Sequence, residues 1–222
     1  VFIVAAHHGN ELLSIEYALD TINQLLLDPA LQDLVRGLDI WVVPLLNVDG
    51  NENYWMNDDG SGRKNHWDIN ENGLIESNEG VDLNRNYPFR WGGLGEKGSR
   101  SWFFSTMYRG AAPASEPETQ IMLRLAKKYQ PTALLSWHVT GDVVLSSYTI
   151  DHATPLQPDI PWRIAEKLIA DIPPPGGKNR KIKIKRKLYS VDGVDQDWYL
   201  FNHGAMAYII EGSYLAPQKK YR

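Results

Sequence analysis

Cysteine is absent from the 222-residue sequence, so disulfide bonds and thiolate metal sites are excluded. A transition-metal site in this chain would have to use histidine and carboxylate ligands. Long apolar runs are also missing, because no stretch approaches the roughly 18 consecutive apolar residues of a transmembrane helix, and we expect no membrane insertion. Positive charge is not in excess either. The net charge of −4 gives no broad field that would attract nucleic acid, so no nucleic-acid partner is expected.

The composition that remains is that of an ordinary globular protein. The sequence is 43% hydrophobic and 23% charged, which is enough apolar surface to build a core. Chains of this length in α/β proteins usually fold around one core. We therefore expect a single domain over residues 1–222.

The hydrophobic pattern predicts alternating strands and helices. Short apolar runs rich in β-branched residues predict buried strands at 1–6, 40–46, 132–139, 142–148 and 205–212. Apolar residues recur every three to four positions over 11–26, which predicts a helix with Asn10 as its N-cap. A second helix is predicted at 115–129, with Ser115 as its cap, and a third at 162–170. Strands alternating with helices predict an α/β fold.

Two segments differ from this pattern. Residues 47–110 are rich in Gly, Asn and Asp and show no periodicity, so we interpret them as a long loop-rich insertion; loops of that length are usually functional. Towards the other end, "PPPGG" at 173–177 interrupts the chain. The run 178–187 is rich in Lys and Arg, and the alternating segment "KIKIKRKLY" (181–189) predicts a strand. A solvated sheet edge protected by lysines explains that charge better than an anionic partner site does.

The stretch "AAHHGNE" places two histidines and a glutamate at the end of the first predicted strand. Either His7 or His8 could act together with Glu11 as a metal ligand, at spacings of four and three residues. This pairing alone is weak. A glutamate in the first turn of a helix is also favourable to the helix dipole without any metal.

Three further polar groups stand where predicted strands or loops end. "LLSWHV" places His138 at the end of a buried strand, and "AYIIEG" places Glu211 at the end of another. An unpaired carboxylate there would be costly to desolvate. "GVDLNRNYP" at 80–88 gathers the polar side chains of Asp82, Asn84, Arg85 and Asn86. Because ligand sites collect at strand ends in α/β sheets, these groups predict one common site.

At these residues the chain resembles the zinc carboxypeptidases, of the pancreatic carboxypeptidase and bacterial carboxypeptidase T type. The matching motifs follow one another in order along nearly the whole chain: "HGNE", "NVDG" (47–50), "GRKN" (62–65), "GVDLNRNYP", "YRGAAPASEPET" (108–119), His138, "LYSVDGVDQDW" (188–198) and "YIIEG". The resemblance implies a zinc-carboxypeptidase-like fold, in which helices flank both faces of a central mixed, twisted sheet. It also implies a zinc metallocarboxypeptidase that hydrolyses the C-terminal peptide bond of peptides or proteins.

The resemblance assigns the zinc to His8, Glu11 and His138, and so selects His8 over His7 as the ligand. Two imidazoles and a carboxylate leave a fourth position open for water, as in catalytic zinc sites. Glu211 matches the general base that takes the proton of the zinc-activated water.

The same comparison assigns roles around the substrate. Arg63 matches the arginine that stabilises the oxyanion, and Asn84 with Arg85 matches the pair that binds the terminal carboxylate. Tyr189 stands 22 residues before Glu211, which is the spacing of the mobile tyrosine that closes over the bound residue. Gln196 falls at the position that floors the specificity pocket. Its neutral amide argues against simple selection of basic side chains, although Asp142 or Asp151 could supply charge from another wall.

Some features depart from the family pattern. Asn10 stands where the family often has an arginine, which removes one subsidiary substrate contact, and "VTGD" follows His138 in place of the more usual serine- or glycine-containing runs. Elements that the family places before the first ligand and after the general base are short or absent, so we expect a catalytic core trimmed at both ends. A second hypothesis therefore stays open, namely a relative that acts as a calcium-stabilised binding module or as an amidase on non-peptide amides.

Residues 68–79, "DINENGLIESNE", fit the calcium-binding loop of EF-hands. Glycine at the sixth position permits the tight turn, and oxygen ligands would surround a Ca²⁺ ion. The alternative is an Asn/Asp-rich loop that holds no ion. Because most cytosols hold too little calcium for a weak site, the loop and the resemblance favour a secreted protein, expected to be a monomer. The residues that would supply the ligands are Asp68, Asn70, Asn72, Leu74, Glu76 and Glu79.

Overall fold

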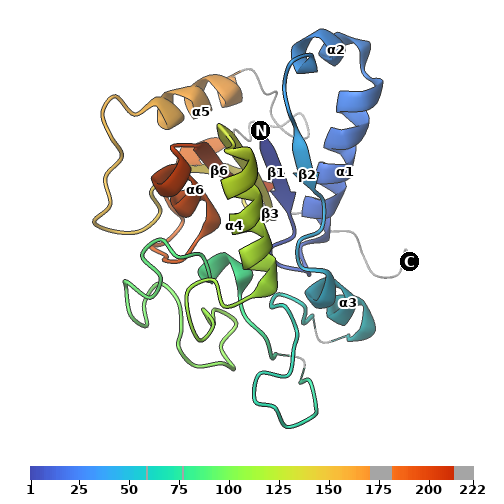
Figure 1. Ribbon diagram of the computed structural model, residues 1–222, viewed down its shortest axis with the longest axis vertical. Helices are drawn as coiled ribbons and strands as arrows, with labels where there is room; N and C mark the ends of the chain where they lie inside the picture. The colour runs from blue at the N-terminus through green and yellow to red at the C-terminus, as the bar shows by residue number, and fades with distance from the viewer. Residues whose placement is uncertain (59, 77, 171–181, 213–222) are drawn as a thin grey trace.

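Strands in the described part of the chain form one six-stranded mixed sheet, and helices lie on both of its faces (Figure 1). The structure is a computed structural model that describes residues 1–58, 60–76, 78–170 and 182–212. The strands are β1 (Phe2–Ala5), β2 (Trp41–Val43), β3 (Ala133–Val139), β4 (Val143–Ser146), β5 (Lys183–Lys185) and β6 (Met206–Gly212). The helices are α1 (Leu12–Leu27), α2 (Pro29–Val35), α3 (Val48–Met56), α4 (Pro117–Tyr129), α5 (Ile160–Ala170) and α6 (Asp195–His203), and a 3₁₀ turn η1 covers Leu83–Arg85.

The strand order is β2-β1-β3-β6-β4-β5, and only the pairing of β4 with β6 is antiparallel. The expected α/β class with a mixed sheet is therefore confirmed. β1, β3 and β6 are neighbouring parallel strands, so their carboxyl ends lie at the same edge of the sheet. The register places His138 of β3 directly beside Glu211 of β6.

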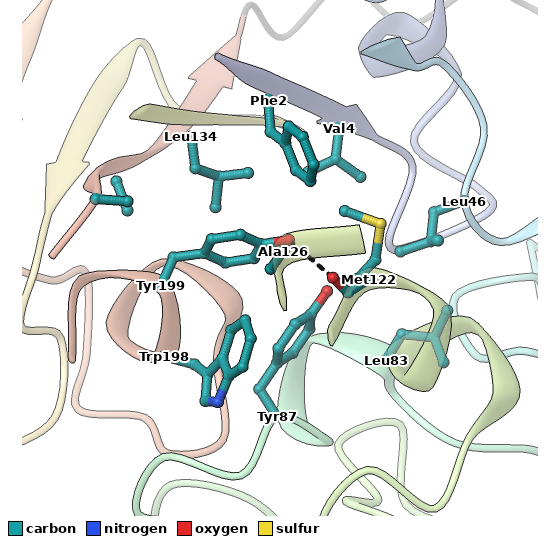
Figure 2. Close-up of a cluster of buried hydrophobic side chains, with 12 residues drawn as sticks. Phe2, Val4, Leu46, Leu83, Tyr87, Met122, Ala126, Leu134, Trp198 and Tyr199 are labelled. Carbon is teal, nitrogen blue, oxygen red and sulfur yellow. Dashed lines mark hydrogen bonds between the residues drawn. The ribbon is translucent and has the colours of Figure 1, made fainter. Parts of the chain in front are cut away.

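The main core lies between the sheet and the helices α4 and α6 (Figure 2). Because side chains alternate across a strand, Phe2 and Val4 of β1 face the same side as Leu134 of β3. The hydroxyl of Tyr199 donates a hydrogen bond of 3.3 Å to the carbonyl of Met122, which ties α6 to α4. Because its hydroxyl is hydrogen-bonded, this fully buried tyrosine leaves no unpaired polar group in the core.

The opposite face of the sheet is covered by α1 and α5. Tyr17 of α1 contacts Trp137 of β3, with ring centroids 5.1 Å apart, and Ala165 of α5 packs with Val144 and Tyr208. With helices on both faces, the sheet can bury its strands on either side, as its apolar runs require. None of the described helices is long and apolar enough to cross a membrane.

The two N-caps predicted from the sequence are wrong. α1 begins at Leu12 after Glu11, not after Asn10, and the Glu11 side chain makes no capping bond because it is engaged with two histidines. α4 begins at Pro117 after Glu116. The hydroxyl of Ser115 instead donates to the Glu116 carboxylate over 2.6 Å.

The loop-rich segment 47–110 contains a helix that the sequence pattern did not predict. Asn47 caps α3 by accepting a hydrogen bond of 2.9 Å from the amide of Gly50. α6 was also missed. The basic strand is shorter than the predicted 181–189 but does lie at the edge of the sheet, as lysine protection predicts. The "PPPGG" break at 173–177 and residues 178–181 lie outside the described residues.

Candidate active site

A cavity of about 180 Å³ opens beside the carboxyl ends of β3 and β6 and the loop that follows β1. All nine residues predicted for zinc, catalysis and substrate binding line it. Its walls also include apolar side chains from β4, β6 and the segment before α6. The predicted residues are His8, Glu11, Arg63, Asn84, Arg85, His138, Tyr189, Gln196 and Glu211.

Three of these residues form a cluster with the geometry of a metal site. One ligand atom from each of His8, Glu11 and His138 lies within 4.8 Å of the others. The Glu11 carboxylate lies between the two imidazoles, with Oε1 at 2.6 Å from Nδ1 of His8 and Oε2 at 3.0 Å from Nδ1 of His138. The same Oε2 accepts a hydrogen bond of 3.1 Å from the amide of Val139, which fixes the carboxylate.

The chain brings these ligands together by ending two strands at one place. β1 ends at Ala5, and Ala6 takes a left-handed backbone conformation (φ 55°) that turns the chain before His8. His138 stands at the end of β3, the parallel neighbour of β1. The spacing of three residues from His8 to Glu11 then spans only the turn into α1.

His7 is fully buried and packs against one member of this cluster. Its ring stacks on that of His138 with centroids 5.4 Å apart, and its Nε2 lies 2.9 Å from the hydroxyl of Tyr87. Burial lowers the pKa of His7 to about 4, which keeps the ring neutral. His7 therefore packs behind the site and contributes no ligand atom to the cluster.

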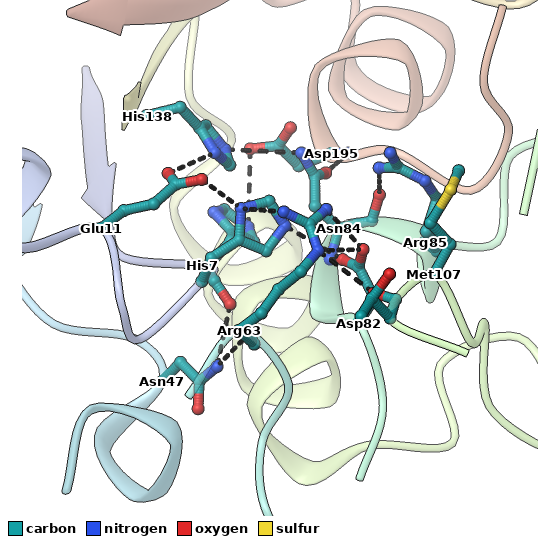
Figure 3. A network of polar contacts seen from close by, with 12 residues as sticks. His7, Glu11, Asn47, Arg63, Asp82, Asn84, Arg85, Met107, His138 and Asp195 are labelled. Carbon is teal, nitrogen blue, oxygen red and sulfur yellow. Dashed lines mark hydrogen bonds and ion pairs between the residues drawn. The ribbon is translucent and has the colours of Figure 1, made fainter. Parts of the chain in front are cut away.

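Asp82 supports the cluster from behind, a role that the sequence analysis did not assign (Figure 3). Its Oδ1 lies 3.1 Å from Nε2 of His8, and its Oδ2 accepts a hydrogen bond of 2.7 Å from Arg63 Nη2. A carboxylate on the far nitrogen of a ligating histidine fixes its tautomer and orients the ring. The polar run "DLNRN" was the available signal for this residue.

Opposite charges dominate the titration behaviour of the cluster. Burial would raise the pKa of Glu11, but the two histidines outweigh it and hold this pKa well below its ordinary range. Burial would lower the pKa of His138, but Glu11 outweighs it and raises the pKa to about 9. The pKa of Asp82 also lies well below normal, because the charges of Arg63 and His8 outweigh desolvation. The two carboxylates are therefore negatively charged and lie beside positive groups. A divalent ion at the cluster would compete with protons for the same ligand atoms.

Glu211 lies across from the cluster at the end of β6. Burial raises its pKa, and the positive charge of His138 only partly offsets this effect. A carboxylate with a raised pKa can accept a proton from water near neutral pH and release it again.

Arg85 presents a buried guanidinium to the cavity. Its Nη1 donates to the carbonyl of Asn84 over 2.6 Å, and its Nη2 donates to the hydroxyl of Tyr189 over 3.0 Å. Its Nε has no partner among the described residues. Tyr189 is half exposed at the cavity rim, so its ring can move without repacking the core. A buried cation with a free donor suits a carboxylate ligand.

Arg63 lies between the metal cluster and Asp82. Its Nη1 is 3.3 Å from Nδ1 of His8, and its Nε donates to both Asp82 and the carbonyl of Thr106. Burial would lower its pKa, but Asp82 and Glu11 raise it, so the group stays positive. A fixed positive charge beside the ligands can stabilise a developing negative oxygen.

The predicted calcium loop lies outside the cavity. Its side chains cap a tight turn, in which Asp68 Oδ2 accepts from the amide of Gly73 over 2.8 Å and Asn72 Oδ1 accepts from that of Leu74 over 2.8 Å. Glu79 is buried and accepts from Asn70 Nδ2 over 2.7 Å and from the amide of Glu76 over 3.1 Å. The loop is thus folded around its own polar groups.

Comparison with known proteins decides the family. A family model for zinc carboxypeptidases matches residues 1–220. This chain belongs to the zinc carboxypeptidase family. Among curated relatives, metallocarboxypeptidase A of Trichophyton tonsurans is 35% identical over 119 residues, covering 52% of this chain and 26% of that protein. Human carboxypeptidase O is 28% identical over 172 residues, covering 76% of this chain and 44% of that protein.

Solved structures share the fold. Bovine thrombin-activatable fibrinolysis inhibitor, in complex with tick carboxypeptidase inhibitor, superposes with a TM-score of 0.79 at 23% identity and covers 100% of this chain and 72% of its own. Carboxypeptidase A of Helicoverpa armigera gives 0.79 at 23% identity, with 97% and 53% covered. The matched region is less than half the length of either curated relative.

Proposed function

We propose that this zinc carboxypeptidase family member is a metallocarboxypeptidase that hydrolyses the C-terminal peptide bond of peptides. The observation that carries the proposal is that one cavity is lined by three metal-ligating side chains, a partly buried carboxylate and a guanidinium with one donor left free by the described residues. A metal site alone would also suit other hydrolases. The buried guanidinium of Arg85 selects substrates that end in a free carboxylate.

The donor set fits zinc. Two imidazole nitrogens and one carboxylate are the ligands that catalytic zinc sites use, and the contact between His8 Nε2 and the Asp82 carboxylate orients the His8 ring. We propose that His8, Glu11 and His138 hold the ion. When bound, zinc would polarise the scissile carbonyl and make water more acidic.

The protein's own groups perform the remaining steps. Arg85 and the amide of Asn84 hold the terminal carboxylate, and Tyr189 closes over it from the rim. Glu211 takes a proton from the attacking water as its oxygen bonds to the carbonyl carbon. Arg63 stabilises the resulting oxyanion, and Glu211 then passes the proton to the leaving amine as the C–N bond breaks.

Release of C-terminal amino acids from a mixed peptide library tests this proposal. We expect the zinc-loaded protein to release free amino acids, and the Glu211→Gln variant to lose about 10²- to 10⁴-fold in kcat, the usual contribution of a general base. C-terminally amidated copies of the same peptides are the matched control and should be poor substrates. Full activity in the variant would remove Glu211 from the mechanism, and zinc-free, inactive protein would favour a binding role.

We further propose that residues 1–222 act as one catalytic domain and that the protein works as a secreted monomer. The loop at 68–79 is proposed to hold a structural Ca²⁺ ion, because its oxygen-bearing side chains surround a turn at Gly73 with positive φ (83°). Calcium should then raise the unfolding temperature, and Glu79→Gln should remove that increase. A temperature unchanged by calcium would contradict the calcium site.

A further inference from the structure

The catalytic cavity has apolar walls beside its polar groups. Leu145, Val191, Val194 and Ile209 line it, and all four are buried. Gln196 lines the same cavity and is itself fully buried. The cavity therefore combines apolar walls with a fully buried neutral amide, a combination that typically fixes the orientation of a bound side chain.

The amide of Gln196 is unsatisfied on both sides. Neither its Oε1 nor its Nε2 has a hydrogen-bond partner within the described ranges, although both atoms are buried. Most buried side-chain polar atoms in proteins have a partner, and an unmet one is costly. A site that leaves both a donor and an acceptor unmet is complementary to a ligand that carries one of each.

Charged ligands match this part of the cavity less well. Among the described residues, the acidic ones that line the cavity are Glu11 and Glu211, which belong to the cluster and the proton-transfer site. Lys187 lines the cavity, but its ammonium group is paired with Asp151, and Asp142 lines a different cavity on the other face of the sheet. Neither aspartate that could have selected a basic side chain faces this site.

The neighbouring carboxylate, Asp197, is also occupied. Its oxygens accept hydrogen bonds from the amide and hydroxyl of Thr149 and from the amide of Ile150, at 2.8 to 3.3 Å. It does not line the cavity but holds the Thr149 segment that does. Asp197 therefore positions one wall, and Gln196 is left as the polar group that a substrate side chain would meet.

We infer that Gln196 selects substrates whose C-terminal residue carries a carboxamide, namely glutamine or asparagine. The inference rests on the proposed function and specifies its substrate class. The substrate amide N–H donates to Oε1 of Gln196, and the substrate carbonyl accepts from Nε2. A thioether meets neither atom, an ammonium group meets only Oε1, and a carboxylate meets only Nε2 while facing Oε1 with like polarity.

Four N-acylated tripeptides that differ only in their last residue, Gln, Met, Glu or Lys, test the inference with zinc-loaded protein. Met matches Gln closely in shape and lacks its polar groups. We expect kcat/KM for the Gln peptide to exceed that for the Met peptide by roughly 10- to 100-fold, since two buried polar atoms are otherwise left unpaired. The Glu and Lys peptides should lie below the Gln peptide.

Gln196→Met should lower the ratio of kcat/KM for the Gln peptide to that for the Met peptide to about one or below. The change should come mainly from the Gln peptide, because a methionine at position 196 can pair with neither polar atom of the substrate amide. Cleavage of the Met peptide should persist and report that the variant is folded. A wild-type ratio near one, or a preference for Lys or Glu, would overturn the inference and leave the proposed function standing. Failure of all four peptides would overturn both.

Discussion

Asp82 is the residue whose replacement tests the support of the metal cluster most sharply. Asp82→Asn keeps the shape of the side chain and removes its charge. In one orientation of the new amide, its oxygen still accepts from Nε2 of His8, as Oδ1 does at 3.1 Å, but an NH₂ group replaces the Oδ2 atom that accepts from Arg63 at 2.7 Å and 3.2 Å. In the flipped orientation the oxygen faces Arg63 and the contact with His8 is lost. Either outcome leaves one partner unmet.

The expected loss of stability follows from burial. Breaking a fully buried ion pair costs about 3–5 kcal/mol, but the Arg63 side chain is 28% exposed, so water compensates in part and we expect about 2–3 kcal/mol. A second effect falls on the metal. Loss of such a histidine partner typically weakens metal affinity about 10- to 100-fold.

Denaturant unfolding and competition with a zinc chelator measure the two effects separately. Asp33→Asn is the matched control, because Asp33 makes a 3.2 Å ion pair with Arg36 in which both side chains are at least 80% exposed. It should change stability by less than about 1 kcal/mol and leave zinc affinity unchanged. If Asp82→Asn behaved like Asp33→Asn in both assays, the bridging role of Asp82 would be refuted.

The pH dependence of stability provides an independent check. The charged form of Asp82 is favoured in the folded state, so its contribution is present above its ordinary pKa of 3.8 and is lost as pH falls below it. The Asn variant should lose less stability over that acidic range than the unchanged protein.

Three further predictions follow from the same geometry. Arg85→Lys should lower kcat/KM for peptides with a free C-terminus by about 10- to 100-fold, because a point charge cannot replace two parallel hydrogen bonds. It should leave the slow cleavage of amidated peptides unchanged, and an equal loss on both substrates would contradict this role of Arg85. The pH profile of kcat/KM should fall on the acid side with an apparent pKa above the ordinary 4.5, because burial raises the pKa of Glu211 and only its deprotonated form acts as a base; a limb at or below 4.5 would argue against that base. Leu134→Ala, in the core under α4, should lower the free energy of unfolding by about 2–5 kcal/mol and leave the zinc stoichiometry unchanged. A loss below about 1 kcal/mol would mean that this part of the core is not packed as described.

The positions of the strands along the chain and the place of the candidate site could be predicted, because strong local patterns mark them. Buried strands such as Ala133–Val139 are short apolar runs, and polar residues at their ends mark the sheet edge where ligands collect. The family resemblance then distinguished His8 from His7, which local spacing alone left open.

The elements that were missed have little local signal. α6 covers only nine residues, and its buried aromatic pair, Trp198 and Tyr199, is adjacent in sequence, so no stripe at helical spacing appears. The caps failed for a different reason. Glu11 directly precedes α1, but its carboxylate contacts His8 and His138 and does not cap the helix. The contact with His138 joins residues more than 100 positions apart, so the local sequence does not predict it.

The role of Asp82 could not be read from its own neighbourhood for the same reason. Its partners His8 and Arg63 come from segments 74 and 19 residues earlier, and only the folded sheet edge brings them together. Likewise, the Gln196 amide lacks a partner among the described residues because of how the cavity is packed, and the neighbouring sequence gives no sign of it.

The most direct test of the central claim is a crystal of the zinc-loaded protein measured at the zinc absorption edge. We expect an anomalous peak within bonding distance of Nδ1 of His8, a carboxylate oxygen of Glu11 and Nδ1 of His138, facing the cavity that holds Glu211 and Arg85. A zinc peak at other residues, with this cluster empty, would contradict it.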